Sequence, residues 1–234
     1  MWRRQSAWAL AFISLWALSA CGGGGGGAGS SATTSTETFQ LRTALVNSLT
    51  DTQALTFSIS GTSSGYPVTG DGTVTQGALT STTFESQQAL QKIDTITGSF
   101  TANGITIPLA TSSTSYLDSN HNPLGESEDS SYTVVSGSVT MPTTAHVNDT
   151  GILYTAVRYA SSAKTTQLGT ETASFAMEPD TFSTALLKVI TVERDTANNV
   201  TSTTTVIFRI TPAGGFTRIS ETFIDDTDTF RLTY

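Results

Sequence analysis

The chain has 234 residues, of which only 13% are charged, and its formal net charge is −8. That charged share is about half of what soluble domains usually carry. Lysine occurs only at Lys92, Lys164 and Lys188, whereas neutralising the phosphates of a nucleic acid requires clustered Lys and Arg. The composition therefore argues against nucleic-acid binding. Its abundance of Thr, Ser and Gly predicts a solvent face built from hydroxyls instead of charges.

The N-terminal segment is organised like a signal peptide. Arg3 and Arg4 form a basic start, and an apolar run follows from Ala7 to Leu18. A run of about a dozen apolar residues suits a signal peptide and is too short to cross a bilayer comfortably. We therefore expect residues 1–20 to be removed from the mature protein, and with them all three Trp residues.

The end of this segment carries the most specific motif of the chain. Leu18, Ser19, Ala20 and Cys21 resemble the lipobox of bacterial lipoproteins at all four positions. In that family the Cys receives a diacylglyceryl group, the leader is cut before the Cys, and the new amine is usually acylated. The resemblance implies a covalent lipid on Cys21. Since each buried methylene contributes about 0.8 kcal/mol, two or three acyl chains would hold the protein on a membrane.

The resemblance also implies a location in the cell envelope. Gly22 is not the acidic residue that the family associates with retention at the inner membrane, so the outer membrane is favoured if the cell is Gram-negative. An ordinary secreted protein with a free Cys is the alternative. Because Cys21 is the only Cys in the chain, no disulfide can form within the chain and no thiolate cluster can hold a metal.

The resemblance and the composition along the chain together predict three parts: a signal peptide at 1–20, the lipidated Cys with a Gly/Ser/Thr-rich tether at 21–37, and a β-rich globular domain at 38–234. The tether has no apolar periodicity. Just beyond it, Leu41, Leu45 and Leu49 recur every four residues. This spacing predicts a short amphipathic helix, with Thr38 as its N-cap.

The rest of the chain alternates with period two. Apolar residues occupy every second position of 55–60, and Asp71-Gly72, Asn103-Gly104 and 195–199 carry hairpin turn signals. We expect ten to twelve short strands. The predicted fold is mainly β, a single antiparallel β-sandwich or a curved open half-barrel with one short N-terminal helix. Strands so short and Thr-rich do not predict a membrane-spanning barrel, which needs about ten residues per strand and an apolar outer band.

Two stretches match catalytic motifs formally. Residues 61–65, GTSSG, fit the G-x-S-x-G nucleophile pattern around Ser63, and residues 161–164, SSAK, fit S-x-x-K. Both motifs need a helix after or around the Ser, whereas both stretches lie between predicted strands and indicate hairpin turns. His121 and His146 lack zinc-ligand spacing. A serine hydrolase that uses Ser63 and one histidine is therefore only a remote alternative.

One loop has a pattern that suits calcium. Asp118, Asn120 and Asn122 alternate as oxygen donors, and Asp129 falls where the twelfth residue of a calcium-binding loop would be. Pro123 stands where such a loop needs a Gly with positive φ. An Asn-rich turn is favoured, and calcium is kept as a weak alternative. No other metal or cofactor is expected.

The leading hypothesis is a lipid-anchored envelope protein whose β-domain is non-catalytic and serves binding, structure or surface display. In this respect the body loosely resembles β-rich lipoproteins of proteobacteria that have no assigned activity. The alternative is a carrier that holds a lipid or another apolar ligand in a curved sheet. The protein, glycan or lipid partner stays open in both.

Replacing Cys21 with Ser tests the anchor. We expect the Cys21→Ser precursor to stay unlipidated and uncleaved, because the lipid is attached through the thiol. Metabolic labelling with palmitate and intact-mass measurement would show both effects. A Ser variant that matures normally and stays on the membrane would contradict the lipoprotein interpretation.

Overall fold

The computed structural model describes residues 35–234. The predicted signal peptide, Cys21 and most of the tether lie outside the described residues, so the lipid anchor stays a prediction. The elements, in chain order, are α1 (Leu41–Thr50), β1 (Leu55–Ser63), β2 (Tyr66–Gln76), β3 (Thr80–Phe84), β4 (Gln87–Ala102), β5 (Ile105–Leu117), β6 (Pro123–Ser127), β7 (Tyr132–Ser136), β8 (Thr150–Tyr159), β9 (Gln167–Pro179), β10 (Ala185–Asp195), β11 (Val200–Ile210), β12 (Phe216–Asp225) and β13 (Asp228–Thr233).

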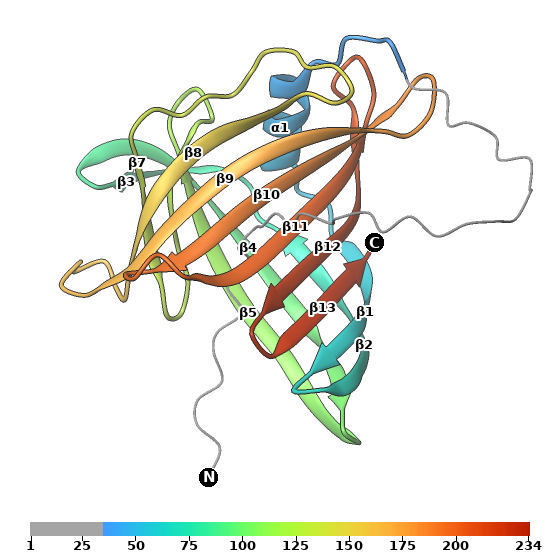
Figure 1. Cartoon of the computed structure of the whole chain (residues 1–234). Helices are drawn as coiled ribbons and strands as arrows, with labels where there is room; N and C mark the ends of the chain where they lie inside the picture. Colours follow the sequence, from blue (N-terminus) through green and yellow to red (C-terminus); the bar gives the residue numbers. More distant parts are fainter. Residues whose placement is uncertain (1–34) are drawn as a thin grey trace, which may run out of the picture.

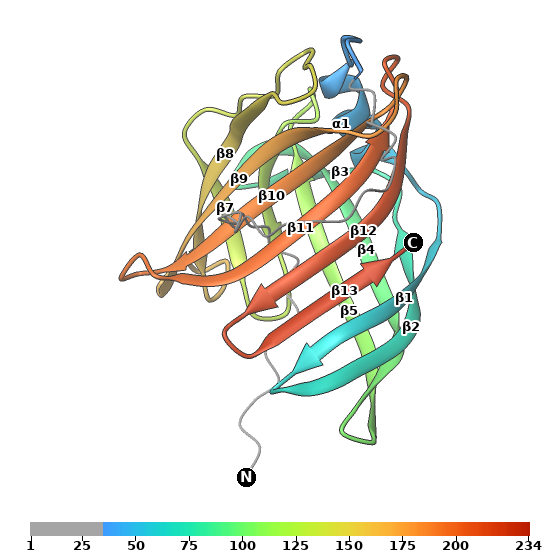
Figure 2. The ribbon, with the colours of Figure 1, turned by 45° about the vertical axis from the view of Figure 1, so that its right-hand side comes forward.

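The strands form one antiparallel sheet that closes into a barrel (Figures 1 and 2). The first strand pairs with the last, β1 with β13, and β2 pairs with β4 over the registers Val68↔Ala102 to Gln76↔Asp94. The short strand β3 pairs with β4 next to β2, on the same edge. Because β2 and β3 lie one after the other along the same edge of β4, they count as one strand of the wall. The described barrel therefore has 12 strands around its wall.

The prediction of a mainly β fold with one short helix is confirmed, but a sandwich or an open half-barrel is wrong. Hydrophobic alternation gives each strand an inner and an outer face and does not identify the strand beside it. Two ladders close the sheet. The β1–β13 ladder joins strands that are far apart in the sequence, and the β2–β4 ladder skips the strand between them. No local turn signal specifies either ladder.

The helix α1 plugs one end of the barrel (Figure 1). Leu41, Ala44 and Leu45 are buried in a cluster with Phe39 and with apolar residues of β8–β11. The predicted leucine stripe is therefore the packed face. Thr38 is not the N-cap: the helix begins after Gln40, which has no capping side chain, and Thr38 instead contacts a histidine.

The opposite end is filled by aromatic and aliphatic side chains. Phe57, Phe100 and Phe230 pack together inside the barrel, the last two with their rings edge to face at 5.7 Å. The turn predicted at Asp71-Gly72 is wrong, because both residues lie within β2. A Cβ on Gly72 would come within 2.5 Å of the Phe57 ring. Gly72 thus makes room for an aromatic ring instead of turning the chain.

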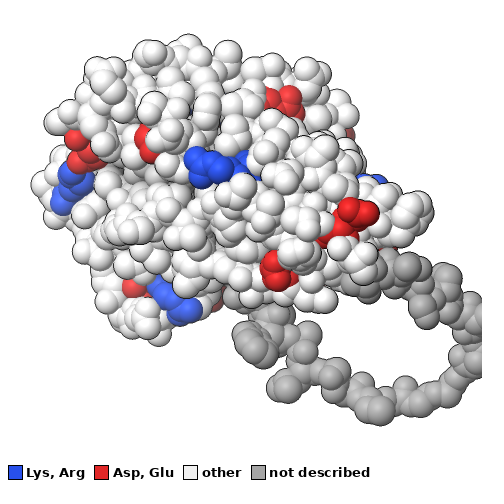
Figure 3. Space-filling view, turned by 90° about the horizontal axis from the view of Figure 1, so that it is seen from above, with Lys and Arg blue, Asp and Glu red and all other residues white. Residues whose placement is uncertain are grey.

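The outer face of the barrel is rich in hydroxyls, as the composition predicted. Its exposed residues on β1 and β2 include Thr56, Ser58, Ser60, Thr62, Thr69 and Thr75. Charged residues are few and scattered on the face that Figure 3 shows. The strands are longer than predicted and reach 16 residues in β4. Within residues 35–234, no helix has the length and hydropathy needed to cross a membrane.

The seam between β1 and β13 can be tested at Gly61. Its φ is +150°, and a Cβ there would lie 1.9 Å from the carbonyl oxygen of Thr229. That oxygen belongs to the closing ladder, so Gly61→Ala should lower the free energy of unfolding by about 3 kcal/mol or more. The measurement is urea denaturation followed by far-UV circular dichroism.

Gly104→Ala is the matched control. Gly104 also has a positive φ, +74°, but no atom lies within 4 Å of its would-be Cβ. Only the cost of a left-handed Ala, about 1–2 kcal/mol, should appear. Equal losses in the two variants would show that the seam is not closed as described.

Candidate functional site

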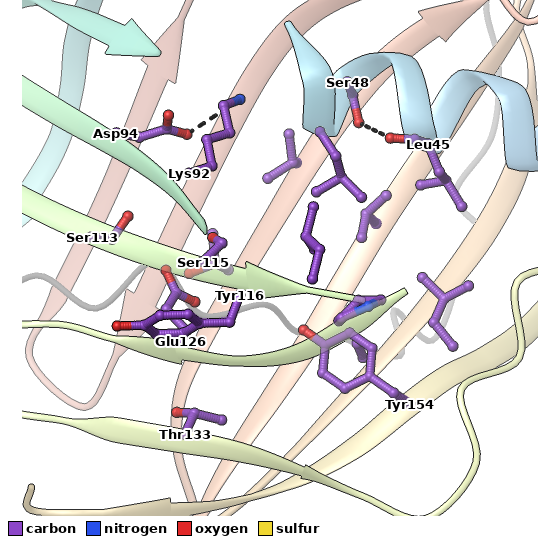
Figure 4. A pocket seen from close by; sticks show the side chains of 18 of the residues that line it. Leu45, Ser48, Lys92, Asp94, Ser113, Ser115, Tyr116, Glu126, Thr133 and Tyr154 are labelled. Carbon is purple, nitrogen blue, oxygen red and sulfur yellow. Dashed lines mark hydrogen bonds and ion pairs between the residues drawn. The ribbon is translucent and has the colours of Figure 1, made fainter. Parts of the chain in front are cut away.

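The barrel holds a partly open cavity of about 230 Å³ between the helix plug and the aromatic end. Figure 4 shows Leu45 and Ser48 of α1 on one side of it, and Lys92, Asp94 and Glu126 on the strands of the other. Part of the wall is apolar, formed by Leu45, Leu49, Leu153, Val189, Val206 and Phe216. A second space of about 50 Å³ continues toward the aromatic end and shares Glu221 with the first.

A belt of polar side chains crosses the wall of the cavity. It is formed by laterally paired residues of five consecutive strands: Lys92 on β4, Ser115 on β5, Glu126 on β6, Thr133 on β7 and Arg158 on β8. Alternate residues of a strand share one face, so a lateral row of this kind points to the same side of the sheet. Four of the five line the cavity, and the fifth, Arg158, is paired with Glu193 on β10.

The basic side chains of the interior are each paired with an acid. Arg158 Nη1 lies 2.8 Å from Glu193 Oε2, which also accepts a hydrogen bond from the Ser202 hydroxyl. Lys92 Nζ lies 3.6 Å from Asp94 Oδ2 and donates to the side-chain oxygen of Gln76 at 2.8 Å. Burial lowers the pKa of Lys92 and raises that of Asp94, while the charge of each partner acts in the opposite direction.

The third pair depends on a β-bulge. Arg218 and Glu221 are three positions apart on β12 and would point to opposite faces of a regular strand. The register shifts between Ile207 and Phe208 of the neighbouring strand β11, so that one residue of β12 is extra. Both side chains therefore point inward and form an ion pair, and the Tyr234 hydroxyl donates to Glu221 Oε2 at 3.2 Å.

Two acids of the cavity wall, Glu126 and Glu171, form no ion pair in the described part of the chain, although Arg158, the partner of Glu193, also acts on Glu171 and lowers its pKa. Glu126 forms no ion pair, and Glu171 accepts one hydrogen bond, from the Tyr154 hydroxyl at 3.1 Å. Burial raises the pKa of Glu126 well above its usual value, and Glu128 and Glu171 raise it further. Burial, together with the charge of Glu193, raises the pKa of Glu171 to about 7. The cavity therefore has an excess of acid.

Several buried polar atoms of this region have no hydrogen-bond partner. In the described residues they are Thr191 Oγ1, Thr204 Oγ1, Arg218 Nε, Ser220 Oγ and Glu221 Oε1. Thr204 and Glu221 line the cavity and are each only 1% exposed. An unmade hydrogen bond on a buried group costs about 1–3 kcal/mol. Such atoms are expected where a ligand or ordered water completes the site.

The residues proposed for a hydrolase are not brought together. Ser63 ends β1, and this strand begins beside α1 and runs to the opposite end of the barrel. His146 Nε2 lies 3.0 Å from Thr38 Oγ1, just before α1, and His121 lies in a turn whose neighbouring Asn binds Arg42 of α1. Both histidines are thus at the helix end. Residues 161–164 form the β8–β9 turn, as predicted, and Lys164 pairs with a Glu.

The loop with the calcium-like pattern is a β-hairpin turn between β5 and β6, which is the interpretation that the sequence favoured. Asp118 Oδ1 accepts hydrogen bonds from the backbone N–H of Asn120 at 2.7 Å and of Asn122 at 2.8 Å, and its Oδ2 accepts one from the Asn122 amide. The turn at 195–199 has the same bonds, although Ala197 stands in place of the second oxygen donor. The hydrogen bonds of the turn therefore explain why Asp118 and Asn122 occur in the pattern, without a bound calcium ion.

The other oxygens of the pattern are engaged elsewhere or lie in another turn. The Asn120 carbonyl and the Asn122 side-chain oxygen accept from Arg42, and Asp129 lies in the next turn, between β6 and β7. Among residues 35–234, no three or more His, Cys, Asp or Glu side chains are grouped so as to hold a metal.

The sequence interpretation missed the acids of the cavity, although a signal was present. In ETASFAM, Glu171 has the same parity as Ala173, Phe175 and Met177, which form the inner face of β9. A charged residue in phase with an apolar stripe is expected to point inward. Comparisons with protein-family models, with curated proteins and with solved structures gave no match.

Glu171 predicts a specific pH dependence of stability. Its pKa is raised from 4.5 to about 7 in the folded state, so the unfolded chain loses this proton first as the pH rises. The stability that the group contributes is fully present below about pH 4.5 and is lost as the pH rises through about 7. Glu171→Gln cannot ionise. It should match the parent near pH 4 and exceed it by up to about 3 kcal/mol near pH 8.

Urea denaturation across this pH range measures the difference. Glu178→Gln, on the outer face of the same strand, is the control and should keep the pH profile of the parent. A parent protein whose stability relative to Glu171→Gln does not change between these pH values would contradict the burial of an unpaired acid.

Proposed function

We propose that this protein is a lipid-anchored binding protein of the cell envelope, which holds a small ligand inside its barrel. The cavity between the helix plug and the aromatic end carries the proposal. The lipobox at Cys21 supports the anchor, since a signal peptide and the motif occur in the order that bacterial lipoproteins use. The carrier hypothesis is thereby preferred to a purely structural or display role.

The lining of the cavity supports a ligand site. Ligand sites combine a mostly apolar wall with a few convergent polar groups, and this wall has both an apolar part and the polar belt. A purely structural barrel gains nothing from buried, unpaired acids, because apolar residues would fill the same space at lower cost. The volume is slightly below the roughly 300–1,000 Å³ of typical ligand pockets, which favours a compact ligand.

Native mass spectrometry tests the proposal on protein purified from its own envelope in mild detergent. We expect an adduct beyond the covalent lipid, and saturable binding of 1-octanol as a small apolar probe. Tyr154 lines the cavity, so a change in tyrosine emission reports the binding. The mature protein should lack Trp, so that this signal is not masked.

A pair of substitutions on β9 controls for location. Ala173 lines the cavity and is 1% exposed, whereas Ala176 lies on the outer face of the same strand. Ala173→Phe should remove the adduct and octanol binding, and Ala176→Phe should keep both. Circular dichroism confirms that each variant is folded. A folded parent that carries no adduct and does not bind octanol would refute a binding role for the cavity.

A further inference from the structure

We infer that the preferred ligand is an organic cation, a primary amine with a short apolar tail, whose ammonium group is held between Glu126 and Glu171. This inference rests on the proposed function and specifies its ligand class. The argument starts from the charges of the interior. Lys92, Arg158 and Arg218 are paired with Asp94, Glu193 and Glu221, respectively.

Glu126 and Glu171 form no ion pair of their own, and both line the same cavity. Tyr154 lines the cavity with them, and its hydroxyl donates to Glu171 Oε1 at 3.1 Å. Burial raises the pKa of this hydroxyl, and the charges of Glu171 and Glu126 raise it further. A cation placed beside Tyr154 would pair with both acids. It would thereby offset the desolvation that keeps their pKa values high.

Unpartnered atoms give an independent indication of the same chemistry. Glu221 Oε1 is an acceptor without a donor, and the Thr204 hydroxyl, also without a partner, can accept as well. Both are almost fully buried in the cavity wall. Arg218 Nε is an unpartnered donor, on a side chain that Glu221 already neutralises, and the Thr204 hydroxyl can also donate. Glu221 Oε1 can only accept, and an ammonium group supplies three donors.

The shape of the cavity favours an amine with a tail over a metal ion. A bare divalent cation would use only oxygen ligands, and no acidic or histidine cluster that could hold a metal occurs in residues 35–234. The apolar part of the wall, which includes Leu153, Val189 and Val206, needs an apolar occupant. An alkylamine presents its charge to the acids and its chain to this wall.

Three probes of matched length test the inference: octylamine, 1-octanol and octanoate. Isothermal titration calorimetry on the folded parent protein near pH 7.5 gives their dissociation constants. We expect octylamine to bind about tenfold or more tightly than 1-octanol, since a charge-assisted hydrogen bond is worth about 1.5–3 kcal/mol. Octanoate should bind most weakly, because the cavity has an excess of acid.

The double variant Glu126→Gln/Glu171→Gln separates charge from shape. It should bind 1-octanol as the parent does, and should lose the tenfold preference for octylamine. It is expected to fold, because it replaces two acids of the cavity wall that form no ion pair with neutral isosteres. Glu178→Gln, on the outer face, should retain the full preference for the amine.

The other outcomes are distinguishable. Equal binding of octylamine and 1-octanol would overturn the ammonium inference and leave the binding role intact. Tightest binding of octanoate would overturn it as well, and would assign recognition to Lys92 and Arg218. If the preference for the amine persists in the double variant, Glu126 and Glu171 are not its source. Failure of all three probes, with no adduct in native mass spectrometry, would refute the binding role itself.

Discussion

Closure of the sheet is the constraint on which the rest of the structure depends. A barrel of eight strands is just wide enough for side chains to fill, and this barrel has 12 strands around its wall. Its interior is too wide for side chains alone. The chain fills one end with α1 and the other with packed aromatic residues. The space between these two plugs is left as the cavity, so the cavity follows from the number of strands and needs no dedicated subdomain.

The same closure determines the electrostatics of the interior. A charge inside a closed wall loses its hydration, and the loss is recovered only through a partner. Arg158 and Arg218 each have such a partner in an ion pair. Glu126 and Glu171 form no ion pair, and their pKa values are raised. Perturbed acids that converge on an enclosed space are more frequent at functional sites than elsewhere. These acids are therefore the part of the interior that stability alone does not explain.

Much of this fold could be predicted from local sequence, and the remainder depends on long-range pairing. Asn103-Gly104 lies at the β4–β5 turn and 195–199 at the β10–β11 turn, because both turns are specified by their own residues. The leucines of α1 gave the helix and its buried face. Closure of the barrel could not be predicted. The pairings β1–β13 and β2–β4 depend on the arrangement of all the strands, and no local motif encodes them. The inward direction of Arg218 was also hidden, because a bulge breaks the period-two alternation on which such predictions depend.

The helix plug and the polar belt are not independent parts. Gln76 on β2 donates to Asp51, immediately after α1, at 3.4 Å, and its side-chain oxygen accepts from Lys92 at 2.8 Å. Lys92 in turn pairs with Asp94 in the cavity wall. Because these groups are largely removed from water, moving one of them leaves the next unsatisfied. The C-terminal end of the plug is thus tied by hydrogen bonds to the charges of the site, and a ligand that repositions Lys92 or Asp94 would act directly on the helix that closes this end of the barrel.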